Sequence, residues 1–318
     1  MENKKTISVM KRMLLLVLLG FSLAFCNKDD NTPGGDPNTG GIDYHQTAAT
    51  QFITAGGTSY AYRVLGNKSG VPLFMIAALG NSMDDWDPAL TNGLAKQRKV
   101  IIFDIQGVSA SGGTTPDNIA GMAKGVVTFI KALGYNKVDL MGFSMGSFIS
   151  QQIVLTEPAL VNKVILTGTG PKGAEGLLNL PGLLQKFGGL SQEDFLLKFA
   201  FTSSEASIEA GKQSYERIQK RVDNRDVPAT PESVTNQVKA VLGWGQPDPN
   251  ALNELKNITQ PVLIVQGEND LPVPAVNAIN MSHSIPNSKL ILYPDAGHAA
   301  VFQNPDNFVQ SASAFLGK

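Results

Sequence analysis

Residues 137–155 read KVDLMGFSMGSFISQQIVL and carry the most informative pattern in this chain. The apolar run Val138 to Met141 has the length of a buried strand, and apolar residues at helical spacing begin just after Met145. Between them lies Gly142-Phe143-Ser144-Met145-Gly146, a G-x-S-x-G motif whose glycines permit a sharp turn from strand to helix. Such a turn holds the serine in a strained conformation with its hydroxyl exposed at the helix N-terminus. Ser144 is therefore the predicted nucleophile.

Strands and helices alternate along most of the chain around this stretch. Apolar runs and turn signals predict strands at residues 51–54, 59–65, 71–78, 100–103, 163–167, 261–266 and 289–293. Helical spacing predicts helices at residues 84–96, 115–133, 273–284 and 305–316, the first of them capped by Asp84-Asp85. The alternation is typical of an α/β protein with a mostly parallel central sheet and helices on both faces.

The pattern changes between residues 174 and about 250, where helical segments follow one another without a clear strand. They cover residues 177–187, 191–201, 205–222 and 230–242. We interpret this insertion as a helical lid over the carboxyl edge of the sheet, where open α/β sheets bind their ligands. A few of its apolar residues are expected to line a pocket above Ser144, and most of them to pack the lid onto the body.

Residues 1–25 are interpreted as a signal peptide. Four basic residues precede residues 13–25, an uncharged run that is too short to span a bilayer. The run ends at Cys26, the only cysteine, and Leu23-Ala24-Phe25-Cys26 resembles a bacterial lipoprotein signal. The resemblance implies that Cys26 is lipidated and anchors an exported protein to the outer membrane or the cell surface. The alternative is an ordinary secretory signal and a periplasmic location.

The remaining chain divides into a tether and one domain. Residues 26–44 are rich in Pro, Gly, Asn and Asp without an apolar period, which predicts a flexible tether. Residues 45–318 suffice for one large α/β domain. A net charge of −1 gives no indication of a nucleic-acid surface. The three histidines and the single cysteine are widely separated, so neither a metal site nor a cofactor is predicted.

The order of the motifs resembles that of the α/β-hydrolase family over residues 50–318. The resemblance is carried by Val71-Pro72, Trp86-Asp87-Pro88, Phe103-Asp104 with Gly107, the Ser144 turn, Leu166 to Pro171, and the loops of Gly267 and His298. The Gly-Phe-Ser-Met-Gly turn is similar to that of the small serine esterases and cofactor-free haloperoxidase-like proteins. The resemblance implies an α/β-hydrolase fold and a Ser-His-Asp triad.

The base that a serine nucleophile needs is assigned to His298. It lies in the loop directly after the last predicted strand. His45, beside the tether, and His283, near the end of a predicted surface helix, are expected to be solvent-exposed and without a role.

The acid of the triad is expected after the strand 261–266, where Asp270 matches the family position. Glu268 is the nearest rival and is expected to face solvent or to cap a turn. The chain order Ser144, Asp270, His298 is the order of this fold.

The two oxyanion donors are predicted to be backbone N–H groups, those of Met145 and Leu79. Leu79 follows the strand 71–78, and the usual His-Gly of the family before it is replaced by Ala77-Ala78. Backbone donation needs geometry and no particular side chain, but the change removes the family's means of holding this loop. Asp104 is predicted to be structural, bonding local backbone amides in a glycine-rich turn.

Two functions of different classes fit these residues. The leading hypothesis is a serine hydrolase that acts through an acyl-enzyme on a small or medium, largely apolar ester, with C–C bond hydrolysis or perhydrolysis as variants of the same chemistry. The alternative, motivated by the altered oxyanion loop, is a surface-tethered ligand-binding protein with weak or no catalysis. The oligomeric state and the natural substrate are left open by the sequence.

Overall fold

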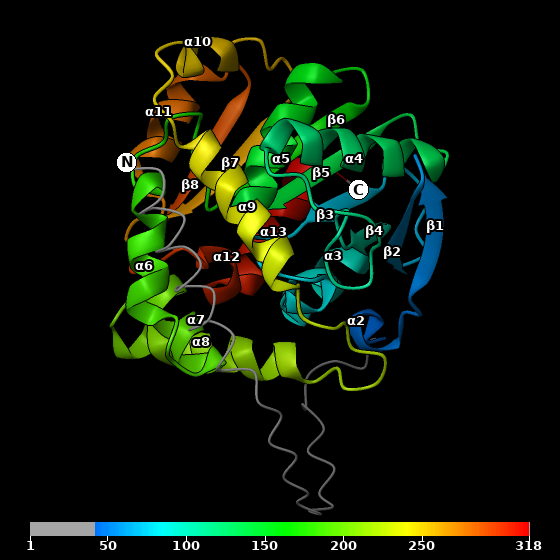
Figure 1. The fold of residues 1–318 in the computed structure, drawn as a ribbon, viewed down its shortest axis with the longest axis horizontal. Helices are drawn as coiled ribbons and strands as arrows, with labels where there is room; N and C mark the ends of the chain where they lie inside the picture. Colours follow the sequence, from blue (N-terminus) through cyan, green and yellow to red (C-terminus); the bar gives the residue numbers. More distant parts are fainter. Residues whose placement is uncertain (1–41, 318) are drawn as a thin grey trace, which may run out of the picture.

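The computed structural model describes residues 42–317. An eight-stranded sheet forms the centre of the molecule (Figure 1). The strand order is β1-β2-β4-β3-β5-β6-β7-β8. The strands are β1 (Gln51–Ala55), β2 (Thr58–Leu65), β3 (Leu73–Ile76), β4 (Val100–Phe103), β5 (Val138–Phe143), β6 (Val161–Thr167), β7 (Val262–Gly267) and β8 (Ser288–Tyr293). Strand β2 pairs antiparallel with β1 and β4, and all later pairings are parallel. The predicted fold class is confirmed.

Helices cover both faces of the sheet because successive strand residues point to opposite sides. On β3, Phe74 and Ile76 belong to one apolar core, and Leu73 and Met75 belong to the other. The first core is closed by α4 (Ile119–Ala132), α5 (Met145–Thr156) and α11 (Val276–Ser284). The second is closed by α3 (Pro88–Ala95), α12 (Ala300–Gln303) and α13 (Pro305–Leu316). Burial on both faces explains why the middle strands read as continuous apolar runs.

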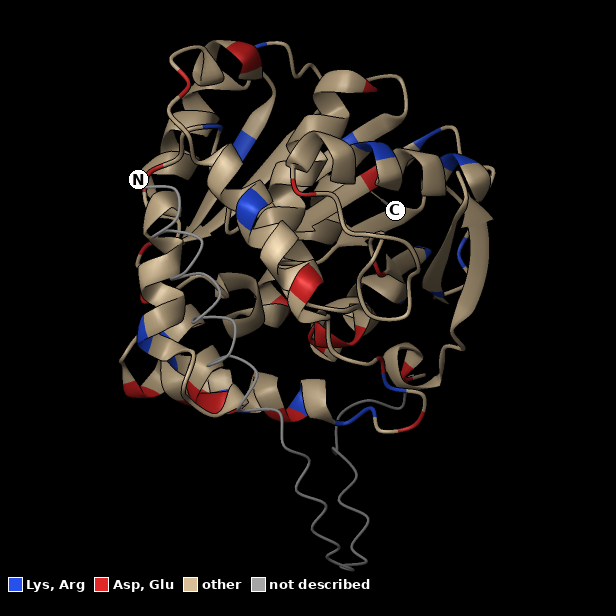
Figure 2. Cartoon of the chain, in the orientation of Figure 1, with Lys and Arg blue, Asp and Glu red and all other residues tan. Residues whose placement is uncertain are grey.

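The helical insertion lies between β6 and β7. It consists of η2 (Leu177–Asn179), α6 (Leu180–Phe187), α7 (Gln192–Ala200), α8 (Glu205–Gln219), α9 (Pro231–Trp244) and α10 (Ala251–Leu255). Helices α6, α7 and α8 contact one another in sequence, and α9 packs against α4 and η2 (Figure 1). Acidic and basic residues are interspersed along α8 (Figure 2). The predicted helical block is present, and its role as a lid stays a prediction.

The starts of α3 and α4 differ from the prediction in the residue that forms the cap. Asp84 and Asp85 do not cap α3; they lie in a separate short helix, η1 (Met83–Asp85), and the cap of α3 is Asp87, which accepts the N–H of Ala89. Helix α4 begins after Asn118, four residues later than predicted, because this side chain accepts the N–H of Gly121. Both errors concern which of several neighbouring polar residues forms the cap.

His45 is buried, so the prediction that it is solvent-exposed is wrong. It lies in α2 (Tyr44–Thr47), and its Nδ1 is 2.9 Å from Thr91 Oγ1. Arg221, also buried, donates to the backbone oxygens of His45 (2.6 Å), Gln46 (2.8 Å) and Ala48 (3.1 Å). Burial lowers the pKa of His45 to about 4. The chain is thus anchored from α2 onward by contacts with α3 and with Arg221, just after α8.

Residues 1–41 lie outside the described part of the chain, so the predicted signal peptide, the lipidation of Cys26 and most of the tether stay predictions. Between residues 42 and 317, no helix has the length and apolar character that crossing a membrane requires.

Candidate active site

Ser144 lies at the junction of β5 and α5 with a backbone φ of 53° and ψ of −119°. A positive φ is unfavourable for a residue with a side chain, and this strain exposes the hydroxyl at the turn. The glycines on either side are required by space. A Cβ on Gly142 would lie 2.3 Å from the oxygen of Gly146, and one on Gly146 would lie 2.0 Å from the oxygen of Ile76. The G-x-S-x-G motif therefore forms the strained turn predicted from the sequence.

Hydrogen bonds from neighbouring polar groups fix this turn to β6. The N–H of Ser144 donates to the oxygen of Thr167 at 2.9 Å. The hydroxyl of Ser147 donates to the oxygen of Gly142 at 2.7 Å and accepts the N–H of Thr167 at 3.0 Å. Ser147 is fully buried. The buried hydroxyl of Ser147 thus links the turn to the adjacent strand β6.

His298 and Asp270 are joined directly. Nδ1 of His298 lies 2.8 Å from Oδ2 of Asp270, and both side chains are buried. The carboxylate is held on its other side by the N–H of Val273 (2.9 Å to Oδ1) and by Nε2 of Gln266 (2.7 Å to Oδ2). An acceptor at Nδ1 leaves Nε2 of His298 as the nitrogen that can take a proton from another group.

The imidazole of His298 lies beside the Ser144 turn. Its ring centroid is 5.1 Å from that of Phe143, the residue before the serine, and 5.9 Å from that of Phe199 on α7. A Cβ on Gly168, which follows β6, would lie 2.9 Å from Cε1 of His298. Among residues 42–317, no hydrogen bond links Ser144 Oγ to His298, and such bonds are often long before substrate binds.

The two predicted oxyanion donors lie at the ends of adjacent parallel strands. Leu79 follows β3 and Met145 follows β5, and Gly146 contacts the backbone of Ile76 and Ala77 closely enough to exclude any side chain. In the described chain, neither the N–H of Leu79 nor that of Met145 donates to another protein group. Two amides without an acceptor beside a strained serine suit an oxyanion hole.

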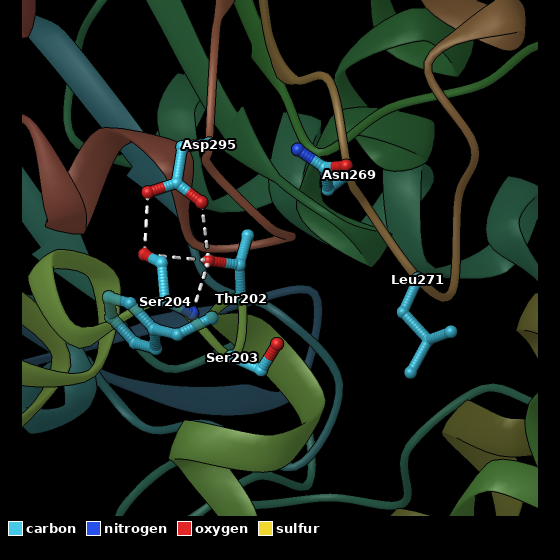
Figure 3. Close-up of a pocket in the computed structure, with 7 residues that line it drawn as sticks. Thr202, Ser203, Ser204, Asn269, Leu271 and Asp295 are labelled. Atoms are coloured by element: carbon cyan, nitrogen blue, oxygen red, sulfur yellow. Dashed lines mark hydrogen bonds between the residues drawn. The ribbon is translucent and has the colours of Figure 1, made fainter.

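An open cavity of about 480 Å³ lies beside the loops of Asp270 and His298 (Figure 3). It is lined by Asn269, Leu271, Asp295 and residues 201–204. Asp295 accepts from the hydroxyls of Thr202 (2.7 Å) and Ser204 (2.5 Å), and these bonds lower its pKa. Its φ of 49° is positive, so the bonds stabilise a strained loop three residues before His298. The helical insertion thereby holds the histidine loop in place.

Asp104 lies inside the protein as a structural residue, and Glu268 and His283 lie at the surface, as predicted from the sequence. Asp104 is buried and accepts the N–H groups of Met83 (2.9 Å) and Ala110 (3.3 Å), and burial raises its pKa well above the ordinary range. Glu268 and His283 are exposed. The described residues include no group of three or more side chains that could hold a metal ion.

Sequence reasoning missed the residues that position the site. Gln266 orients Asp270, Gly168 leaves room for the imidazole, and Gln237 of α9 contacts the loop of Leu79. Only Gly168 carried a signal, because a glycine directly after a strand suggests a close approach of another group.

Comparisons with known proteins agree with the fold. The alpha/beta hydrolase fold family matches residues 71–305. A solved "Alpha/beta hydrolase fold protein from Chitinophaga pinensis" is 38% identical, with a TM-score of 0.84 over 86% of this chain and 99% of that one.

Two curated relatives are more distant. A 2-hydroxy-6-oxononadienedioate/2-hydroxy-6-oxononatrienedioate hydrolase of Pseudomonas putida is 28% identical over 70% of this chain and 78% of its own length. A Mycobacterium tuberculosis protein provisionally named a non-heme bromoperoxidase is 25% identical over 76% of this chain and 91% of its own. These relatives support an enzyme of the hydrolase class. The chain belongs to the α/β-hydrolase fold family.

Proposed function

We propose that this protein is a serine hydrolase that uses Ser144, His298 and Asp270 on a small or medium, largely apolar ester. The observation that carries the proposal is the buried 2.8 Å contact between His298 Nδ1 and Asp270 Oδ2, held against the residue that precedes the strained Ser144. A carboxylate on Nδ1 fixes the tautomer in which Nε2 can act as a base. This arrangement has no evident use in a purely structural protein.

In the first half of the reaction, Ser144 Oγ attacks the carbonyl carbon while His298 Nε2 takes the hydroxyl proton. Asp270 stabilises the imidazolium that forms, and the N–H groups of Leu79 and Met145 stabilise the oxyanion. The C–O bond of the ester then breaks, and the imidazolium gives its proton to the leaving alcohol. The serine is left as an acyl-enzyme.

Water completes the cycle. His298 removes a proton from a water molecule, which attacks the acyl carbon, and the bond to Ser144 Oγ breaks as the serine regains its proton. The product acid leaves and the free enzyme is restored. The same residues serve C–C bond hydrolysis or perhydrolysis when a carbon leaving group or hydrogen peroxide replaces the alcohol or the water.

Aromatic side chains near His298 favour an apolar substrate. Phe199 meets the imidazole edge to face, and Phe195 stacks on Phe199 with ring centroids 5.3 Å apart. Both are only partly buried and belong to α7 of the insertion, which we propose acts as a lid. Apolar surface of this kind gains free energy by covering an acyl chain.

The test compares Ser144→Ala with Ser150→Ala, a matched change on the same helix in which the lost hydroxyl only bonds the oxygen of Gly146. Turnover of p-nitrophenyl esters of increasing chain length and labelling by a fluorophosphonate should disappear in Ser144→Ala and persist in Ser150→Ala. Full activity in Ser144→Ala would remove this residue from the mechanism.

A second candidate function is a surface-tethered ligand-binding protein with weak or no catalysis, motivated by Ala77-Ala78 in the oxyanion loop. The same fluorophosphonate experiment separates the two functions, since a binding protein would leave the probe unreacted in the wild type.

For the location, we propose export and lipid attachment through Cys26. Palmitate labelling of the full-length chain, lost in Cys26→Ser, would support attachment, and unchanged labelling would contradict it.

A further inference from the structure

Helix α9 of the insertion contacts the oxyanion loop through one fully buried side chain, Gln237. Its Oε1 accepts the N–H of Gly80 at 2.7 Å, and its Nε2 donates to Ser233 Oγ at 3.0 Å. The orientation of the amide is determined, because a backbone N–H can only donate and must therefore face the amide oxygen. Gln237 is thus already engaged at both ends and is not available to bind a substrate.

The bond to Ser233 continues into the body of the protein. Ser233 Oγ lies 2.7 Å from Thr115 Oγ1, and both residues are buried. Asn236, on the same helix, donates from Nδ2 to the backbone oxygen of Thr115 at 3.0 Å. The position of Gln237 is therefore determined by α9 together with the loop that precedes α4.

The group that Gln237 holds is the central peptide of a tight turn. The N–H of Asn81 donates to the oxygen of Ala78, and Gly80, the third residue of the turn, has a φ of 79°, as in a type II turn. A type I turn would reverse the peptide between Leu79 and Gly80 and present its carbonyl to Gln237. With its oxygen toward the loop, Gln237 accepts this N–H and stabilises the observed backbone conformation of Leu79.

From these contacts we infer that Gln237 is a positioning residue for the oxyanion hole: by accepting the N–H of Gly80, it fixes the turn that carries the donor Leu79. This inference rests on the proposed function. The bond joins residues 157 positions apart in the chain, so the support of this turn comes from the inserted helix.

The test uses two substitutions of Gln237. Gln237→Met keeps the length of the side chain and removes the acceptor, and we expect kcat to fall about 10- to 100-fold with KM nearly unchanged. The affinity for a trifluoromethyl ketone analogue of the ester should fall by the same factor, because the defect acts on the oxyanion.

Gln237→Glu should rescue the defect in a pH-dependent manner. A protonated carboxyl can accept the N–H of Gly80 and donate to Ser233, and burial favours the protonated form. Its kcat relative to wild type should approach one near pH 6 and decline as pH rises, because an ionised carboxylate loses the donor and repels the oxyanion. A general loss of packing would not give this profile.

Two further variants separate the effect on the turn from an effect on the helix. Gly80→Ala strains the same turn without a steric clash and should reproduce the loss in kcat. Thr235→Ala removes a hydroxyl of α9 that bonds only the oxygen of Pro231 in the same helix, and it should leave kcat within about twofold.

Each outcome decides a specific point. If the wild type is active and the folded Gln237→Met variant keeps the same kcat, this inference is overturned and the proposed hydrolase remains intact. Equal losses in Gln237→Met and Gln237→Glu at every pH would overturn it as well. Wild-type protein without esterase turnover or probe labelling would overturn both proposals.

Discussion

Gly168 offers a test of the assigned base that leaves the triad residues untouched. A Cβ added at this position would lie 2.9 Å from Cε1 and 3.1 Å from Nδ1 of His298. Ordinary contacts of a Cβ begin near 3.4 Å, so the imidazole and the new methyl group must separate by about half an ångström. The ring cannot yield freely, because it is bonded to Asp270 and packed against Phe143 and Phe199.

The expected result of Gly168→Ala is a loss of about 10- to 100-fold in kcat, the usual cost of misplacing a catalytic group by up to about 1 Å. The variant also loses stability, because a φ of 57° costs a residue with a Cβ about 1–2 kcal/mol. Steady-state turnover of a p-nitrophenyl ester measures the first effect, and thermal unfolding measures the second.

A matched control separates the two effects. Gly134 has a similar positive φ of 82°, but a Cβ there would meet nothing within 4 Å. Gly134→Ala should therefore lose comparable stability and keep the kcat of the wild type. If Gly168→Ala folds and its kcat stays within twofold of the wild type, the assignment of His298 as the base is refuted.

Two further predictions concern stability. Burial and the charge of Asp84 raise the pKa of Asp226 to about 7, above the value of about 4 in the unfolded chain, so this carboxyl makes the fold progressively less stable as pH rises from about 4 to about 7. Asp226→Asn should therefore gain in melting temperature relative to the wild type between pH 5 and pH 8, and a constant difference would contradict the assignment. Phe129 is fully buried and packs against four aromatic rings, so Phe129→Ala should cost about 3–5 kcal/mol in denaturant unfolding. The exposed Phe52→Ala should stay within about 0.5 kcal/mol, and similar losses in the two variants would count against the described core.

The secondary structure was largely predictable because it depends on local periodicity. Every predicted strand is present within about two residues, since buried strands are apolar runs bounded by turn residues. The helices that were missed, α2, α10 and α12, have only four or five residues, too few to show a helical period. Helix α8 ends at Gln219, three residues before the predicted end at Val222.

The burial of His45 was not predictable from its neighbours in the sequence. A histidine next to a polar, glycine-rich segment suggests solvent, and the groups that bury it are Thr91 and Arg221, far away in the chain. The same reason hid Gln237, whose surroundings in α9 give no sign that its amide meets Gly80.

Local sequence specifies the strained turn at Ser144, because a strand, two glycines and a helix define that geometry within a few residues. It also determined the sheet class and the positions at strand ends from which Asp270 and His298 project. The contact between these two side chains depends on long-range packing, because it requires β7 and β8 to pair in the observed register. Likewise, the support of the Leu79 turn by α9 depends on the packing of an inserted helix, which no local pattern encodes.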